Sequence, residues 1–196
     1  MRRSGRIRRV RILGAKAIFL DRDGTLNRKA PEGQYIRRAQ ELELLPGAVT
    51  AVRRINISGI LTALITNQRW LSEPAADMEA YYAVHARLRH LLAVHDAWLD
   101  ACYVCPHQIN SCGCRKPKPG MLLNAAHDLG INLRSSLVIG DSVSDVQAGL
   151  AVGAKTVLID PARNSFYRSR PHFIANSIND AVNWALDEVG KPAPAG

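Results

Sequence analysis

Short apolar runs alternate along the chain with longer segments in which apolar residues recur every three or four positions. The short runs predict buried β-strands at residues 17–20, 60–65, 101–104, 137–139 and 156–159. The longer segments predict one helix between Gly47 and Gly59, and others at about residues 73–95, 120–129, 145–152 and 178–189. Strands that alternate with helices in this way predict an α/β fold with a doubly wound, Rossmann-like parallel sheet.

Three of the predicted strands end in polar residues. The first strand runs into Asp21 and Asp23, the second into Thr66, and the fourth into Asp141. Because open α/β sheets bind their ligands at the carboxyl ends of the strands, we expect these side chains to meet in one crevice. Since side chains alternate along a strand, Asp21 and Asp23 are expected to project to one side and Arg22 to the other.

The first two carboxylates can divide a phosphoryl transfer between them. Asp21 would attack phosphorus and form an aspartyl-phosphate, while Asp23 would protonate the leaving oxygen and later take a proton from water. Such a charged pair needs a cation, and Mg²⁺ suits oxygen ligands and phosphate. A calcium-binding EF-hand loop also begins with Asp-x-Asp, but Thr25 and Leu26 stand where that loop needs Asp or Asn and then Gly. The remaining alternative is a solvated pair at a strand end.

The apolar strand followed by Asp-x-Asp-Gly-Thr resembles the first motif of the haloacid dehalogenase superfamily of phosphotransferases. The resemblance extends over residues 17–160 and implies further site residues. In this superfamily a Thr binds the transferring phosphoryl group, a Lys neutralises the nucleophile and the phosphate, and an acidic residue holds Mg²⁺ with the nucleophile and a backbone carbonyl. These roles fall here to Thr66, to Lys116, and to Asp141 together with Asp21 and the carbonyl of Asp23.

Asp145 follows Asp141 by four residues, and its role has two interpretations. Its carboxylate could support the site from behind the residues that touch the substrate. Equally, an acidic residue in the first turn of a helix is favoured by the helix dipole, without any part in catalysis. The sequence leaves both interpretations open.

Three cysteines and a histidine lie within ten residues after the third predicted strand, at Cys105, His107, Cys112 and Cys114. This Cys₃His set is typical of tetrahedral zinc, and four protein ligands indicate a structural rather than a catalytic site. In a reducing compartment, clustered cysteines favour a metal over disulfides. Cys102 could take the place of His107, but it falls inside the apolar strand, so we expect it to be a small buried residue.

The zinc loop followed by Arg-Lys-Pro narrows the resemblance to capless phosphatases that carry such a loop. These are the bacterial D-glycero-D-manno-heptose 1,7-bisphosphate phosphatases and the related histidinol-phosphate phosphatases. The resemblance favours hydrolysis of the heptose bisphosphate at its 7-phosphate, with histidinol phosphate as the alternative substrate. It implies substrate contacts at Tyr35 and Arg115. We also expect contacts from Asn67 and Gln68, which follow Thr66, and from Arg69, whose charge could meet a second phosphate.

Three features depart from the usual pattern of these phosphatases. Arg69 and Trp70 stand where the family has small residues, and Ser142 stands where many heptose phosphatases carry Lys. The loop between His107 and Cys112 is also shorter than usual. None of these changes alters a predicted catalytic residue, so they bear on the choice of substrate rather than on the reaction.

The positive charge of the chain is concentrated at its start. The net charge is +9, yet residues 1–16 contain seven Lys and Arg residues and no acidic residue. We interpret residues 1–16 as a basic tail, residues 17–190 as one phosphatase domain with its zinc loop at residues 105–114, and residues 191–196 as a second tail. An Arg-rich, acid-poor start is also compatible with an organellar transit peptide.

The basic tail raises the alternative of a zinc-bearing protein that binds nucleic acid. That interpretation leaves the three polar strand ends unexplained. No apolar run reaches the length of a membrane span, and the basic start is not followed by a signal-peptide pattern. We therefore expect a cytoplasmic monomer that binds a small phosphorylated substrate, and neither nucleic acid nor membrane.

Overall fold

The computed structural model describes residues 14–163 and 170–190. Their strands form one six-stranded parallel sheet in the order β3-β2-β1-β4-β5-β6. The strands are β1 (Ala17–Leu20), β2 (Leu61–Asn67), β3 (Ala101–Cys105), β4 (Leu137–Gly140), β5 (Lys155–Ile159) and β6 (Phe173–Ala175). This sheet confirms the predicted doubly wound α/β class. Its strand order reverses at β1, which pairs with both β2 and β4, and ligands of such sheets bind at this reversal.

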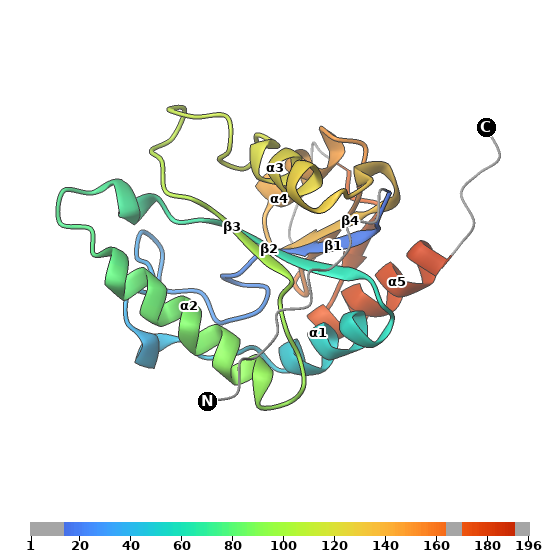
Figure 1. The fold of residues 1–196 in the computed structure, drawn as a ribbon, viewed down its shortest axis with the longest axis horizontal. Coiled ribbons are helices and arrows are strands. Elements are labelled where there is room, and N and C mark those ends of the chain that lie inside the picture. Colours follow the sequence, from blue (N-terminus) through green and yellow to red (C-terminus); the bar gives the residue numbers. More distant parts are fainter. Residues whose placement is uncertain (1–13, 164–169, 191–196) are drawn as a thin grey trace, which may run out of the picture.

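Helices cover both faces of the sheet (Figure 1). Helices α1 (Ala48–Ile57), α2 (Met78–Ala93) and α5 (Ile178–Gly190) pack on one face, and α3 (Gly120–Leu129) and α4 (Val143–Leu150) pack on the other. The side chains of β1 alternate between the two layers. Ile18 and Leu20 join the first core, while Ala17 and Phe19 join the second, and all four are fully buried. Burial on both faces explains why β1 is continuously apolar.

Two helices begin at other residues than the sequence predicts, because polar side chains cap them. Helix α2 was predicted from residue 73 but begins at Met78, since the Asp77 carboxylate accepts a hydrogen bond from the Glu79 backbone amide at 2.8 Å. Helix α4 was predicted from Asp145 but begins at Val143, with Ser142 as its N-cap. Strand β6 was missed, because three residues are too short to show a period.

The two predicted tails lie largely outside the described residues. Residues 1–13 and 191–196 lie outside the described residues, so the two predicted tails are not tested there. Within the first predicted tail, Ala15 forms a bridge with Ile131, and the Lys16 ammonium donates to the Val189 carbonyl at 2.6 Å. Residues 15 and 16 therefore pack onto the domain.

The connections between the strands carry no inserted domain. Within residues 17–159, all of which the structure describes, they consist of helices α1 to α4, short 3-10 turns and loops. This agrees with the predicted capless arrangement. Among the residues described, no helix has both the length and the apolar character needed to cross a membrane.

Candidate active site

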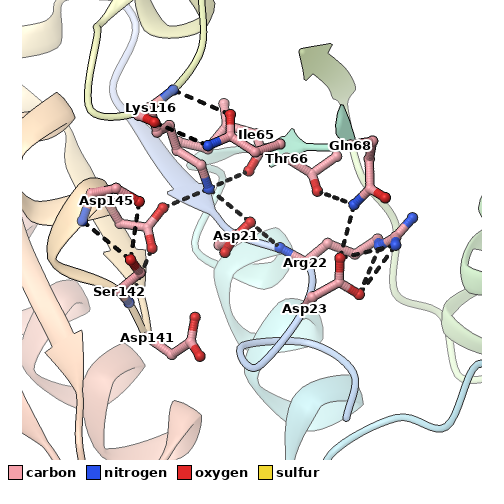
Figure 2. A network of polar contacts seen from close by, with 12 residues as sticks. Asp21, Arg22, Asp23, Ile65, Thr66, Gln68, Lys116, Asp141, Ser142 and Asp145 are labelled. Carbon is pink, nitrogen blue, oxygen red and sulfur yellow. Dashed lines mark hydrogen bonds and ion pairs between the residues drawn. The ribbon is translucent and has the colours of Figure 1, made fainter. Parts of the chain in front are cut away.

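A cleft of about 440 Å³ lies at the carboxyl ends of β1, β2 and β4. The predicted catalytic and metal-binding residues line it together: Asp21, Asp23, Thr66, Lys116 and Asp141. They come from segments far apart in the sequence, which the strand order brings to one edge of the sheet (Figure 2). The structure thus brings together the polar strand ends that the sequence predicted to meet.

Lys116 is the most completely paired side chain of the cleft. Its ammonium lies 2.7 Å from Asp21 Oδ1 and 2.5 Å from Asp145 Oδ1, and it donates to the Ile65 carbonyl at 3.1 Å (Figure 2). Three acceptors match the three hydrogens of an ammonium group. Burial disfavours the charge, but the carboxylates of Asp145 and Asp21 raise the pKa of Lys116, so it stays protonated.

Asp145 makes contacts of both kinds that its two interpretations require, one toward the cleft and one at the start of α4. Its carboxylate pairs with Lys116, and it also accepts the Ser142 backbone amide at 3.2 Å as part of a capping box at the start of α4. It is fully buried, and a side chain at Gly140 would collide with it. Asp145 therefore supports Lys116 from behind the cleft and fixes α4 at the same time.

Asp21 comes directly after β1 and is oriented from two sides. Its Oδ1 accepts the Lys116 ammonium and the Arg22 backbone amide, each at 2.7 Å. Burial raises the pKa of the Asp21 carboxyl to about 6, although the Lys116 ammonium lowers it. The predicted nucleophile is therefore ionised at neutral pH and held in one orientation.

The Asp23 carboxylate is held by a buried arginine, which corrects the expectation that Arg22 points away from it. The Arg22 guanidinium donates to Asp23 at 2.9 to 3.2 Å, because β1 ends at Leu20 and strand alternation does not continue into this turn. Asn27 donates to the same carboxylate at 2.9 Å. Burial alone would raise the pKa of Asp23, but the Arg22 charge and these hydrogen bonds lower it.

Asp141 follows β4 and lies against the turn at Gly24. Gly24 has φ +89°, and a side chain there would collide with the Asp141 carboxylate, so this turn needs glycine. Asp141 Oδ2 forms an ion pair with the Lys29 ammonium. Its Oδ1 is buried and has no hydrogen-bond partner in the described part of the chain. Burial raises the pKa of Asp141 even though Lys29 lowers it.

These carboxylates fit a divalent cation. Single oxygens of Asp21, Asp141 and Asp145 lie within 4.8 Å of one another. Asp145 is engaged by Lys116 and by the helix cap, whereas Asp141 offers a buried, unpartnered oxygen. Oxygen ligands of this kind suit Mg²⁺. The fit therefore favours Asp21 and Asp141, as predicted, while the backbone carbonyl of Asp23 as a third ligand stays a prediction.

The predicted substrate contacts divide into two groups. Tyr35, Asn67 and Arg115 line the cleft, whereas Gln68 and Arg69 are not among its lining residues. Asn67 also braces the neighbouring lysine, because its amide exchanges two hydrogen bonds of 3.1 Å with the backbone of Lys116. We retain Tyr35, Asn67 and Arg115 as candidate substrate contacts.

Gln68 lies behind the cleft and is fully buried. Its amide nitrogen donates to Asp23 and to Thr66, each at 2.8 Å, so neither amide hydrogen is left for a substrate. Trp70 is also buried, with 1% of its surface exposed, and does not line the cleft. The large residues after Thr66 therefore do not narrow the cleft, contrary to what their size alone indicates. Gln68 becomes a supporting residue rather than a substrate contact.

The predicted zinc ligands cluster tightly. The Cys105, Cys112 and Cys114 sulfurs and His107 Nδ1 all lie within 4.8 Å of one another, with sulfur–sulfur distances of 3.3 to 3.6 Å. A tetrahedral ion with Zn–S bonds of about 2.3 Å requires ligand separations of this size. Cys102 lies elsewhere, with its sulfur 3.8 Å from the Tyr81 hydroxyl. The donor set thus fits zinc, and the choice of His107 over Cys102 agrees with the geometry.

Several site residues were missed from the sequence. Lys29 has no assigned role in the sequence analysis, and nothing in its spacing predicts its ion pair with Asp141. Arg22 was expected on the other side of the strand, and Asn27 had no assigned role. Their contacts depend on how the chain turns after β1. The one sequence feature that could have indicated the pairing of Arg22 with Asp23 is the alternation of charge at residues 21–23.

Known proteins are similar to this chain in sequence and in fold. A family model described as HAD-hydrolase-like matches residues 113–181. A D-glycero-D-manno-heptose-1,7-bisphosphate 7-phosphatase of Thermosynechococcus vestitus is 37% identical over 190 residues, covering 86% of this chain and 94% of the relative. A D-glycero-beta-D-manno-heptose-1,7-bisphosphate 7-phosphatase of Escherichia coli is 32% identical over 181 residues, covering 88% and 89%.

A solved structure extends the likeness to three dimensions. The D,D-heptose 1,7-bisphosphate phosphatase from B. bronchiseptica, complexed with magnesium and phosphate, superposes with a TM-score of 0.78. It is 28% identical in sequence, and the match covers 88% of this chain and 99% of that chain. The sheet order, the cleft at its reversal and the family model together define a phosphatase of the haloacid dehalogenase class. The chain belongs to the D-glycero-D-manno-heptose-1,7-bisphosphate 7-phosphatase family.

Proposed function

We propose that this chain is a Mg²⁺-dependent phosphatase that removes the 7-phosphate of D-glycero-D-manno-heptose 1,7-bisphosphate through an aspartyl-phosphate on Asp21. The observation that carries the proposal is the pairing of Asp21 with Lys116 at 2.7 Å in a cleft that Asp23, Thr66 and Asp141 also line. A carboxylate beside a fixed ammonium can approach a phosphate dianion that it would otherwise repel. The relatives reported above are named for this activity, and this chain matches most of their length.

In the first step, an Asp21 oxygen attacks phosphorus and the bond between phosphorus and the sugar oxygen breaks. Asp23 gives a proton to the departing sugar oxygen, so the sugar leaves as an alcohol. The pKa of Asp23 lies below its ordinary value in the free protein. An approaching phosphate dianion raises it, because a like charge disfavours the ionised carboxylate. Substrate binding thus helps Asp23 to carry the proton that it must donate.

In the second step, water attacks the phosphorus of the aspartyl-phosphate. Asp23 takes the proton of that water, the bond between Asp21 and phosphorus breaks, and inorganic phosphate leaves. Asp23 is then protonated and Asp21 is a free carboxylate, so the cycle closes. Throughout, Lys116 offsets negative charge on Asp21 and the phosphoryl group, and Thr66 donates a hydrogen bond to a phosphoryl oxygen.

Two metal ions complete the proposed enzyme. Mg²⁺, held by Asp21 and Asp141 with the Asp23 backbone carbonyl, would supply positive charge that offsets the phosphate. Zinc, held by the Cys₃His set, would fix the loop immediately before Arg115 and so fix where that cation points. Asp141 Oδ1 and the close sulfurs are the observations that support these assignments.

The choice of a bisphosphate rests on cations in the lining of the cleft. Arg115 Nη1 is buried without a partner in the described part of the chain, and buried donors are normally hydrogen-bonded. Lys29 lies in the same lining, so Lys29 rather than Arg69 supplies a second cation. A guanidinium can bind a second phosphate bidentately. Histidinol phosphate instead brings a cationic amine, which these two cations would repel.

A comparison of kcat/KM for the heptose bisphosphate and histidinol phosphate tests the proposal. We expect the bisphosphate to be the better substrate and Asp21→Asn to abolish its hydrolysis. Arg115→Ala should raise KM for the bisphosphate about tenfold, and less for a monophosphate, because it removes a charge-assisted contact. Arg69→Ala is the matched control and should change KM little. Faster hydrolysis of histidinol phosphate would overturn the substrate assignment.

A further inference from the structure

Trp70 follows Asn67, a residue of the cleft lining, by three positions, and its side chain contacts a polar group behind the cleft. The indole Nε1 donates a 2.9 Å hydrogen bond to Gln68 Oε1, and both side chains are buried. An indole N–H can only donate. The oxygen of the Gln68 amide must therefore face Trp70, and its nitrogen must face the other way.

The opposite end of Gln68 demands the same orientation. The amide nitrogen lies 2.8 Å from Asp23 Oδ2 and 2.8 Å from Thr66 Oγ1 (Figure 2). An ionised carboxylate can only accept, so it requires the nitrogen. The two hydrogens of the amide serve one acceptor each, and its oxygen serves the indole. The hydrogen bonds of this buried amide are therefore satisfied in one orientation only.

This orientation determines what Asp23 and Thr66 offer to a ligand. Asp23 Oδ2 receives a donor that holds the carboxylate in place. Thr66 Oγ1 accepts from Gln68, which leaves the hydroxyl hydrogen to donate into the cleft that Thr66 lines. If the amide rotated by half a turn, its oxygen would repel the carboxylate and would capture the Thr66 hydrogen. The indole N–H thus supports the one amide orientation that serves two groups facing the reacting phosphate.

Trp70 is itself held by Arg37, which follows a segment of the cleft lining. The Arg37 guanidinium lies 5.2 Å from the centre of the indole ring and forms an ion pair of 2.8 Å with Glu73. Arg37 directly follows residues 29–36, which form one wall of the cleft. The stacking of a guanidinium on an indole is favourable, so the loop and the indole hold each other.

We propose that Trp70 is a positioning residue, whose indole N–H fixes the Gln68 amide and thereby the Asp23 carboxylate and the Thr66 hydroxyl. The inference rests on the proposed function, since it assigns these two groups to the transfer of a phosphoryl group. It gives Trp70, one of the departures from the family pattern, a task behind the site rather than in the choice of substrate.

The test is a double-mutant cycle of Trp70→Phe and Gln68→Met. Trp70→Phe keeps an aromatic ring beneath Arg37 but removes the N–H. We expect kcat to fall about 10- to 100-fold with KM changed less than about twofold, because catalytic groups lose their alignment while the cleft keeps its shape. Gln68→Met should lower kcat similarly. In the Gln68→Met background, Trp70→Phe should have no further effect, because the amide that it orients is gone.

Trp98→Phe is the matched control. The Trp98 indole donates to Asp100 at 3.2 Å and is partly exposed, and neither residue lines the cleft. This variant should keep the kcat of the natural chain. Wild-type kcat in Trp70→Phe would overturn the proposal. An equal fall in kcat with and without Gln68 would also overturn it, because Trp70 would then act through packing alone.

A measurement that does not depend on turnover separates this proposal from the proposed function. The side-chain NH₂ of Gln68 should give NMR signals that are protected from solvent exchange, and Trp70→Phe should remove that protection while the control keeps it. If the natural chain releases no phosphate but the protection follows this pattern, the proposed function fails and the orienting contact stands. If turnover is normal and protection is unchanged in Trp70→Phe, the positioning role fails alone.

Discussion

The floor and the rim of the cleft are built in different ways. On the floor, the buried Lys116 is paired with Asp21 and Asp145, and directly behind the floor the buried Gln68 is paired with Asp23, Thr66 and Trp70. On the rim, Lys29 is 54% exposed, and Arg115 has a nitrogen without a partner in the described part of the chain. The floor therefore fixes the catalytic groups. The rim instead holds a half-exposed lysine, paired only with Asp141, and an arginine nitrogen without a partner among the described residues, and a substrate phosphate can approach both.

Replacing one lysine in each region should give the largest difference in the free energy of unfolding between floor and rim variants. Lys116→Met leaves Asp21 and Asp145 buried without their shared cation, so it should lower the free energy of unfolding by about 3–5 kcal/mol and abolish turnover. Lys29→Met breaks an ion pair of a half-exposed side chain and should cost less than about 1 kcal/mol. Urea unfolding of both variants measures the difference. Equal losses would show that floor and rim are not built differently.

The charge on the floor should also appear as a pH dependence of stability. The folded chain raises the pKa of Asp21 from 3.8 to about 6, so ionisation of this group favours the unfolded chain. Stability that is present below about pH 4 is thus lost as the pH rises through 6. Without metal, Asp21→Asn should match the natural chain at pH 4 and exceed it by about 2–3 kcal/mol at pH 7, since one pKa unit corresponds to about 1.36 kcal/mol. A difference that does not change with pH would contradict the assigned pKa.

Loss of zinc from the loop should have a smaller effect, and this effect should be confined to substrate binding at the rim. The natural chain should hold about one zinc ion after dialysis against Mg²⁺, and Cys112→Ala should lose it. Loss of the ion should raise KM about tenfold through the position of Arg115, while the floor keeps its stability. Cys102→Ala removes a cysteine outside the cluster and should keep both zinc and KM. Full zinc content in both Cys112→Ala and His107→Ala would show that the ligand set is wrong.

The floor was more predictable from the sequence than its supports. Asp21, Thr66 and Asp141 stand at the ends of strands, and the fold rule that gathers strand ends needs only a local pattern. Gln68 and Arg37 could not be assigned in this way. Their contacts with Asp23 and Glu73 join residues 45 and 36 positions apart, and these residues lie outside the strands and α-helices that show a hydrophobic period. Arg69 was given a substrate contact from its charge alone, whereas the cleft lining contains Lys29 instead.

In the proposed mechanism, Asp21 carries the phosphoryl group. The most direct measurement is a crystal structure of the protein grown with Mg²⁺ and beryllium fluoride, which mimics an aspartyl-phosphate. We expect beryllium bound to a carboxylate oxygen of Asp21, with Lys116 and Thr66 at hydrogen-bond distance from the fluorides. Beryllium fluoride bound to another residue, or to none while Mg²⁺ occupies the cleft, would contradict the covalent mechanism.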